Sequence, residues 1–222
     1  MNRRGFIAAS ALATWTATAA PARAARPARP IRIPADGVIR TAFAIGPGVN
    51  VIDTAGPWEV FCDSMIAGGR ARFDLFTVAA STHPVLGNSD LEITPRYSYT
   101  GAPQPHVVVI PAHNSTNDTL AWLRKVARHA DLVMSVCTGA FVLAQTGLLD
   151  GKTATTHHGS YADFEAMFPK IKLLRGRRYV EHERVATAGG LTSGIDLALR
   201  VVERYLGTQA AAATARYLEY RA

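Results

Sequence analysis

The stretch that decides the fold is Asp131-Leu-Val-Met-Ser-Val-Cys-Thr-Gly-Ala140. Its apolar run up to Val136 has the length of a buried strand, and the small residues after Cys137 lead into a helical pattern. The stretch therefore predicts a strand that turns directly into a helix, with a thiol on the turn. Because a helix N-terminus carries partial positive charge, this position favours thiolate and a reactive role for Cys137. A cysteine that only fills space fits the same position.

Further apolar runs and helical patterns define the fold class. The runs that are strand-length and bounded by turn residues are 39–45, 73–79 and 106–110. Helices are expected at 58–66, with Pro57 at the first helical position, and at 117–129, 139–148, 161–168, 193–206 and 210–220. Strands that alternate with helices of this length predict an α/β fold, a mostly parallel sheet with helices on both faces.

The composition fits one globular domain without a nucleic-acid partner. The chain has 222 residues, of which 48% are hydrophobic, enough for one sizeable core. The formal net charge of +7 is concentrated at one end, because six of the 24 basic residues and one of the 17 acidic residues precede residue 39. The remainder of the chain is nearly neutral. Phosphate binding needs a concentrated basic face, so nucleic-acid binding is not expected.

The basic end has the features of an export signal. Residues 2–7 read Asn-Arg-Arg-Gly-Phe-Ile, a weakly apolar run follows, and Ala22-Arg-Ala24 resembles a cleavage site. We expect a twin-arginine signal peptide at residues 1–24 and a periplasmic or secreted protein with no membrane anchor after cleavage. An uncleaved anchor is the alternative, but the run is shorter than the ~18–20 apolar residues of a spanning helix. The Pro- and Arg-rich residues 25–38 are expected to form an extended tether.

Two cysteines, Cys62 and Cys137, are too few for a disulfide framework. A single disulfide between them stays open, because sequence cannot measure their separation. Cys62 lies in an amphipathic pattern with Val60 and Phe61, so its side chain is expected to face the core or a partner. We therefore expect Cys137 to be much the more reactive thiol.

Other polar side chains lie at strand ends, where open parallel sheets bind ligands. Asp53 follows the first predicted strand, and its carboxylate suits either proton transfer or a turn. His113 and His157 follow later strands, where an imidazole either binds a ligand or is structural. Glu59 and Thr192 are interpreted as helix-terminal residues, Thr192 as a cap rather than a nucleophile. The sequence contains neither His-Glu-x-x-His nor paired Cys-x-x-Cys, so no metal is expected.

Five motifs occur in order along the chain. They are Asp-x-x-Gly-Pro-x-Glu-Val-Phe at 53–61, Val-Val-Val-Ile-Pro at 107–111, Ser-Val-Cys-Thr-Gly-Ala at 135–140, Gly-Leu-Leu-Asp-Gly-Lys-Thr-Ala-Thr-Thr-His at 147–157 and Ala-Gly-Gly-Leu-Thr-Ser-Gly-Ile-Asp-Leu-Ala-Leu at 188–199. Together they resemble the ThiJ/PfpI superfamily, and most of all isonitrile hydratases and the amidase-like sensor domains of AraC-type regulators. The resemblance covers residues 39–207 and implies a flavodoxin-like sandwich, beyond which residues 208–222 are expected to form a C-terminal helix.

The resemblance also implies roles for individual residues. Cys137 lies on the family's nucleophile elbow, Asp53 is the nearby acid, and Thr138 is beside the thiol. Backbone N–H groups of His113 and Thr138 are expected to stabilise developing negative charge. The residues expected at the oxyanion or substrate site are His113, Thr138, Gly56 and His157.

The chain departs from the family pattern in two ways. Many relatives have Pro-Gly-Gly where this chain has Pro111-Ala-His113, so an imidazole is expected to enter or flank the pocket. Only 15 residues follow residue 207, too few for a helix-turn-helix pair, so a DNA-binding regulator is not expected.

These features lead to an expected function. The chain is expected to be an exported, Cys-dependent lyase or hydrolase of a small molecule, similar to isonitrile hydratase, working as a homodimer without metal or cofactor. The alternatives are a non-enzymatic ligand-binding module related to the AraC-type sensor domains, and a peptidase or glyoxal-processing enzyme. The sequence leaves the substrate and turnover itself open.

Overall fold

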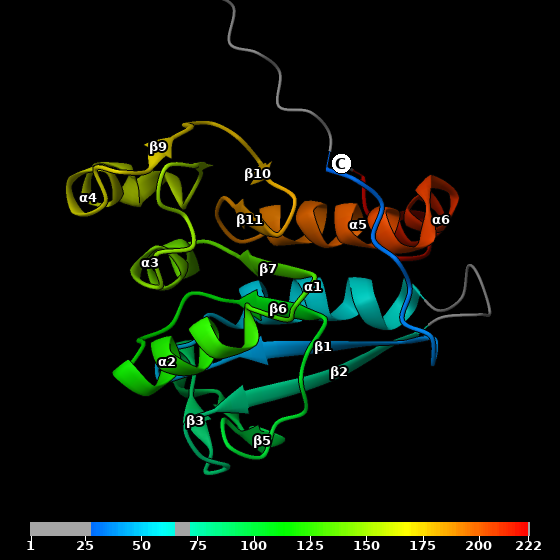
Figure 1. Ribbon diagram of the computed structural model, residues 1–222, viewed down its shortest axis with the longest axis horizontal. Coiled ribbons are helices and arrows are strands. Elements are labelled where there is room, and N and C mark those ends of the chain that lie inside the picture. The colour runs from blue at the N-terminus through cyan, green and yellow to red at the C-terminus, as the bar shows by residue number, and fades with distance from the viewer. Residues whose placement is uncertain (1–27, 65–71, 222) are drawn as a thin grey trace, which may run out of the picture.

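The chain folds into a mostly parallel sheet between two layers of helices (Figure 1). The computed structural model describes residues 28–64 and 72–221, so the expected signal peptide lies outside the described residues. The main sheet has seven strands in the order β10-β11-β7-β6-β1-β2-β5. In it β10 runs antiparallel to β11, and the other neighbouring strands run parallel. The predicted α/β class is confirmed.

Strands and helices alternate along the chain. The strands of the main sheet are β1 (Val38–Ala44), β2 (Arg72–Ala79), β5 (Tyr97–Ser98), β6 (Val107–Ile110), β7 (Leu132–Ser135), β10 (Tyr179–Glu181) and β11 (Val185–Ala188). Two small sheets pair β3 (Val85–Leu86) with β4 (Glu92–Ile93) and β8 (Thr153–Ala154) with β9 (Lys172–Leu173). The helices are α1 (Val51–Asp63), α2 (Asn117–Val126), α3 (Gly139–Gln145), α4 (Tyr161–Met167), α5 (Ser193–Leu206) and α6 (Thr208–Tyr217).

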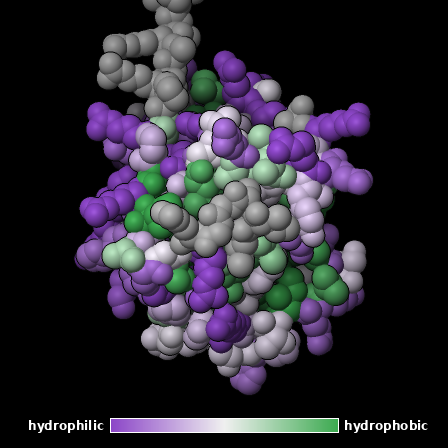
Figure 2. All heavy atoms as spheres, turned by 90° about the vertical axis from the view of Figure 1, so that its right-hand side faces the viewer, coloured by the Kyte–Doolittle hydropathy of each residue, from purple (hydrophilic) through white to green (hydrophobic). Residues whose placement is uncertain are grey.

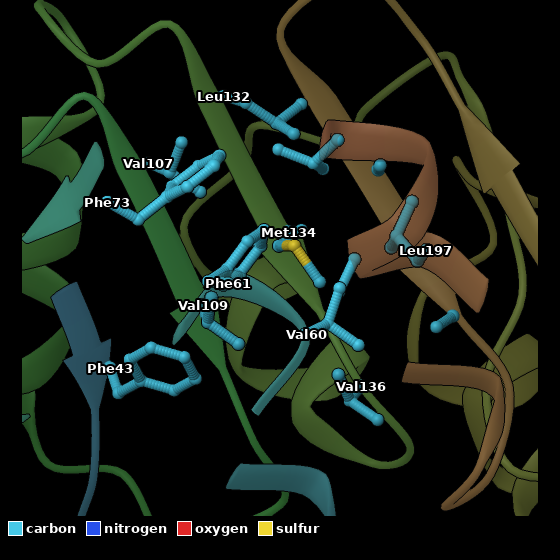
Figure 3. Packing of buried hydrophobic residues seen from close by; sticks show 14 of the residues in the cluster. Phe43, Val60, Phe61, Phe73, Val107, Val109, Leu132, Met134, Val136 and Leu197 are labelled. Atoms are coloured by element: carbon cyan, nitrogen blue, oxygen red, sulfur yellow. The ribbon is translucent and has the colours of Figure 1, made fainter. Parts of the chain in front are cut away.

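The two faces of the sheet bury separate apolar cores. In β6, Val107 and Val109 belong to the core under α1 and α5, whereas Val108 and Ile110 belong to the core under α2, α3 and α4. This alternation follows from the two-residue period of a strand, and because both faces are covered, the strand reads as a continuous apolar run. Figure 3 shows the first core, with Val107 and Val109 near Phe61 of α1.

The strand register brings several loops to one edge of the sheet. Phe43 of β1 pairs with Val109 of β6, and Ile110 of β6 pairs with Ser135 of β7. The carboxyl ends of β1, β6 and β7 therefore lie close together. They are on the side to which the arrowheads of β1 and β2 point in Figure 1. Ligand sites of open parallel sheets form at this edge.

Helix α1 begins earlier than the sequence predicts. The expected first helical residue, Pro57, lies inside α1, which starts at Val51. The start is held by neighbouring loops, because the Asn50 N–H donates to the Ala112 carbonyl (2.9 Å) and the Val51 N–H to the Asn88 side chain (3.0 Å). These contacts fix the helix start ahead of Pro57, whose interior position costs about 3 kcal/mol. Asp53 consequently lies in the first turn of a helix.

The sequence prediction missed the hairpin of β10 and β11. These strands are short, and both hold polar residues, so neither forms the continuous apolar run that identified β1, β2, β6 and β7. β11 nevertheless lies in the interior of the sheet beside β7. The Gly189–Leu191 turn after β11 is therefore placed next to the turn after β7.

Residues 28–33, the end of the expected tether, are bound to the domain. The Ile31 N–H donates to the Arg204 carbonyl (2.8 Å), and the Arg204 guanidinium donates to the Arg29 carbonyl (3.0 Å). Arg204 is itself buried on α5, where hydrogen bonds to carbonyl oxygens replace its lost hydration. This part of the segment thus packs along α5.

Cys62 does not face the core, one of the two expected orientations, and the other, toward a partner, stays a prediction. The core face of α1 carries Pro57, Val60 and Phe61, which leaves the next residue on the outward side of the helix. The Cys62 side chain is exposed and that of Cys137 is buried, and both thiols are free. The exposure of Cys62 removes the reason for expecting it to be the less reactive thiol.

The surface at the amino ends of the strands is mainly hydrophilic, with scattered apolar residues (Figure 2). Such scattered apolar residues are ordinary on a folded surface. Across residues 28–64 and 72–221, every helix falls short of the length and apolarity needed to cross a membrane.

The close packing of α3 on β6 gives a first prediction. A Cβ at Gly139 would lie 2.1 Å from the Ile110 carbonyl oxygen, so Gly139→Ala is expected to cost about 3 kcal/mol or more of unfolding free energy. Gly147, at the end of the same helical segment with φ +83° and open space around it, is the control, and Gly147→Ala should cost about 1 kcal/mol. Urea denaturation measures both; equal losses would contradict the packing argument.

Candidate active site

Cys137 occupies a sharp turn between β7 and α3. Its backbone has φ +58°, a left-handed conformation that is strained for a residue with a Cβ. Two hydrogen bonds hold it there: the Cys137 N–H donates to the Gly189 carbonyl (2.8 Å), and the Thr156 hydroxyl donates to the Cys137 carbonyl (2.9 Å). The residue is only 6% exposed. The turn has the form expected of a nucleophile elbow.

Asp53 reaches Cys137 by a route that the sequence did not predict. The strand before Asp53, β1, does not neighbour β7, the strand before Cys137, because β6 lies between them. The loop after β6 bridges the gap, because the Ala112 N–H donates to Asp53 Oδ2 (3.2 Å). The fully buried carboxyl group also lies close enough to the Cys137 thiol for its charge to raise the pKa of that thiol. The two side chains therefore form a pair.

Burial raises both pKa values of this pair. Desolvation raises the pKa of Asp53 to about 6, although hydrogen bonds from the Ala112 N–H, the Cys137 thiol and the Leu191 N–H oppose the rise. Burial and the negative charge of Asp53 raise the pKa of Cys137 to about 11, against the N–H groups of Thr138 and Leu191. At neutral pH the pair is thus a carboxylate next to a neutral thiol.

This state corrects the expectation that the helix N-terminus makes Cys137 a thiolate. Helix α3 has only seven residues, and the desolvation of a buried thiol next to a carboxylate outweighs its effect. Any reaction at the sulfur would first have to remove this proton, and the neighbouring Asp53 carboxylate is a group that can accept it.

Leu191 is a site residue that the sequence prediction missed. Its φ is +52°, and its backbone N–H lowers the pKa of both the Asp53 carboxyl group and the Cys137 thiol. A leucine rarely adopts this backbone conformation, so the strain marks a position where the N–H direction matters. The sequence signal for a special backbone at Leu191 was the preceding pair Gly189-Gly190, which lies next to the helix start assigned at Thr192.

Thr192 does take the N-cap position of α5, but its side chain caps no backbone N–H. Its hydroxyl instead accepts hydrogen bonds from the Arg178 guanidinium, which also pairs with Asp196 on α5. The prediction that the Thr192 side chain caps the helix was therefore wrong. The contacts tie the Leu191 turn to β10 and α5.

The remaining predicted site residues are distributed around the elbow. The Thr138 N–H lies at the sulfur. Gly56 packs against Ile195 of α5, where a Cβ would lie 3.0 Å from a side-chain carbon, so it allows α1 and α5 to approach. The His157 ring lies against Gly190 of the Leu191 turn, where a Cβ would lie 2.3 Å from the ring. Substrate contacts of Gly56 and His157 stay predictions.

The His113 imidazole packs against the turn after β1. Its Nδ1 lies 2.9 Å from the Pro111 carbonyl, and its ring covers Gly46, where a Cβ would lie 2.7 Å away. Burial lowers the pKa of His113, and the Pro111 carbonyl only partly opposes this, so the ring is neutral at pH 7. Within the described residues no group of three His, Cys, Asp or Glu side chains could hold a metal ion, and the His113 ring forms no such group with Asp53 and Cys137.

Comparison with known proteins identifies the family. Residues 39–204 match the DJ-1/PfpI family. The chain belongs to the DJ-1/PfpI family. This confirms the resemblance drawn from the motifs, and with it the flavodoxin-like fold.

Relatives of this DJ-1/PfpI chain include enzymes and regulators. It is 30% identical to an isonitrile hydratase of Pseudomonas putida, over 82% of this chain and 78% of that protein. It is 34% identical to the HTH-type transcriptional regulator CdhR of Pseudomonas aeruginosa, over 76% of this chain and 51% of the regulator. The chain thus spans about half the length of that regulator.

Solved structures support the same DJ-1/PfpI fold. A ThiJ/PfpI family protein from Pseudomonas syringae is 27% identical and superposes with a TM-score of 0.72, over 82% of this chain and 75% of that one. Drosophila melanogaster DJ-1beta, at 16% identity, superposes with a TM-score of 0.70 over 82% of this chain and 98% of that one. The second likeness concerns the fold alone.

The strained backbone at Cys137 predicts an unusual order of stability. Glycine adopts φ +58° without strain, whereas alanine loses about 1–2 kcal/mol there. We expect Cys137→Gly to be more stable than Cys137→Ala by about 1 kcal/mol in urea denaturation. Ala144→Gly within α3 is the control and should lower stability by about 1 kcal/mol. A Cys137→Ala protein as stable as Cys137→Gly would argue against a strained elbow.

Burial of Asp53 predicts a pH dependence of stability. Its pKa in the folded protein, about 6, lies above the ordinary value of 3.8, so this group destabilises the fold progressively as pH rises from about 4 through 6. Asp53→Asn removes that loss, and its stability relative to wild type should increase by on the order of 3 kcal/mol from about pH 3.5 to about pH 7.5. The matched control is Asp63→Asn at the other end of α1. If the unfolding free energies of wild type and Asp53→Asn change in parallel with pH, the raised pKa of Asp53 is contradicted.

Proposed function

We propose that the protein is a Cys-dependent hydratase that converts an isonitrile and water into an N-substituted formamide. The observation that carries the proposal is the fully buried Asp53 carboxyl group beside the Cys137 thiol, whose pKa its charge raises. The isonitrile hydratase relative, which aligns over most of both chains, supports the choice of substrate. The leader expected from the sequence would place this activity outside the cytoplasm.

An isonitrile carbon suits this pair because the same atom accepts a nucleophile and then a proton. In the first step the Cys137 sulfur bonds to that carbon while its proton passes to the Asp53 carboxylate. Asp53 then delivers the proton to the carbon, which leaves a thioformimidate on Cys137. A base with a pKa of about 6 can both accept and return a proton near neutral pH. The N–H groups of Thr138 and Leu191 stabilise negative charge on sulfur during the transfer.

Water completes the reaction. The water oxygen adds to the thioformimidate carbon. Asp53 takes one proton from that water and passes it to the substrate nitrogen. The carbon–sulfur bond then breaks, the remaining hydroxyl proton returns to Cys137, and the formamide leaves. The sum is one isonitrile plus one water, and both Asp53 and Cys137 return to their starting states.

A ligand-sensing module without turnover is the second candidate. It is favoured by the regulator CdhR, which is 34% identical to this chain. It is also consistent with the low exposure of Cys137, 6%, since a sensor needs only to bind its ligand. Turnover measurements separate the two candidates.

The proposal predicts that Asp53→Asn separates thiol reactivity from catalysis. Without the negative charge the pKa of Cys137 falls, so alkylation of Cys137 by iodoacetamide at neutral pH should be faster than in wild type. Formamide production from an isonitrile panel should fall by about 100-fold or more, because the proton acceptor is lost. Alkylation is read by mass spectrometry of the Cys137 peptide, and formamide by chromatography.

Two further variants complete the test. Cys137→Ala should abolish formamide production, and Cys62→Ala, which alters the exposed thiol, should leave it unchanged. Formamide production by Cys137→Ala would overturn the proposal. A wild-type protein that turns over no isonitrile of the panel but binds one would favour the sensing module.

A further inference from the structure

A cavity of about 310 Å³ opens beside the elbow. It lies between the loop after β8, which contributes Thr156 and His157, and the turn after β11, which contributes Gly190 and Leu191. The same two segments reach Cys137, because the Thr156 hydroxyl donates to its carbonyl and the Leu191 N–H lowers the pKa of its thiol. Cys137 itself is not among the lining residues, so a ligand must extend from this cavity past Thr156 and Leu191 to meet the thiol.

The charged residues that line the cavity are basic. Arg177 and Arg178 line it together with His157 and His158, and its lining contains no Asp or Glu. The charge of Arg178 is compensated by Asp196. Within the part of the chain that the structure describes, Arg177 forms no ion pair. One uncompensated positive charge therefore remains at this wall.

His157 adds a hydrogen-bond donor to the wall. Its Nδ1 accepts a hydrogen bond from the Gly159 N–H (3.2 Å), so the proton of the neutral ring is on Nε2. The Nε2 edge lies over Gly190, where a Cβ would be 3.2 Å from that nitrogen. The His158 ring supports this orientation by packing on His157, with ring centroids 4.3 Å apart.

An apolar surface completes the cavity. The Leu191 side chain lines it and is 40% exposed, unusual for a large apolar residue that the backbone holds in a strained conformation. A ligand that covers Leu191 removes this apolar surface from water. The cavity thus combines a cation, an N–H donor and an apolar patch, a set that suits a small organic anion.

We infer that the substrate carries a carboxylate, which binds Arg177 and the His157 Nε2–H while its reactive carbon faces Cys137. The inference rests on the proposed function for the reaction, but the recognition of an anion stands on the cavity alone. For an isonitrile, the substrate class is an isocyano carboxylic acid. Arginine and carboxylate form charge-assisted hydrogen bonds, which select an anion over its neutral ester.

Turnover tests the inference with isocyanoacetate and its methyl ester, which differ in charge and share the reactive group. Arg177→Gln should lower kcat/KM for isocyanoacetate by about fivefold, mainly through KM, and leave the ester nearly unchanged. Arg175→Gln is the matched control, because Arg175 lies in the same loop, pairs with Glu165 and does not line the cavity. Equal effects of Arg177→Gln on acid and ester would overturn the inference.

Alkylation of Cys137 gives a readout that does not require turnover. Iodoacetate and iodoacetamide react alike with a thiol but differ in charge. The charge of Asp53 affects the ratio of their rates equally in wild type and in Arg177→Gln. The ratio of iodoacetate to iodoacetamide rates at Cys137 should fall by about fivefold in Arg177→Gln and stay constant in Arg175→Gln. If no isonitrile is turned over but this ratio falls, the anion site stands and the hydratase proposal fails. If isonitriles are turned over and the ratio is unchanged, the anion site fails.

Discussion

The left-handed backbone at Cys137 is the constraint on which the site depends. A strand becomes a helix there within a few residues, and the turn is held by Gly189, by Thr156 and by the missing side chain of Gly139. These contacts come from the loops after β11 and β8 and from the end of β6, segments that are far apart in the sequence and meet only in the folded protein. The strained backbone conformation of Cys137 persists because several independent segments hold this one residue.

Burial makes the carboxyl and thiol pair both costly and useful. Apolar surroundings raise the pKa of Asp53 to about 6 and that of Cys137 to about 11, so the proton stays on sulfur at neutral pH with an acceptor in contact. A buried carboxylate lowers stability, and an interior proline four residues later adds to the cost. The packing of α1 against α5 and β2 offsets these costs with apolar burial on the same helix, at Val60 and Phe61.

The parts of the fold that the sequence predicted are those encoded by local pattern. The buried strands β1, β2, β6 and β7 are mainly apolar runs bounded by turn residues, and α5 has the full period of an amphipathic helix, so its bounds were predicted correctly. The predicted start of α1 was wrong because the Asn50 and Val51 N–H groups donate to Ala112 and Asn88 and fix an earlier start. The core-facing option for Cys62 and the capping role of the Thr192 side chain were wrong because each depends on which neighbours pack nearby.

The sequence by itself determined the fold class, the family, and the elbow that carries Cys137, since each is written in contiguous residues. Only the tertiary structure decided how Asp53 reaches the thiol, because the bridge runs through the loop of a third strand, β6. The tertiary structure also decided the protonation of the pair and the contribution of Leu191. A pKa depends on burial and on charges within a few ångströms, and those neighbours are brought together by folding from distant parts of the chain.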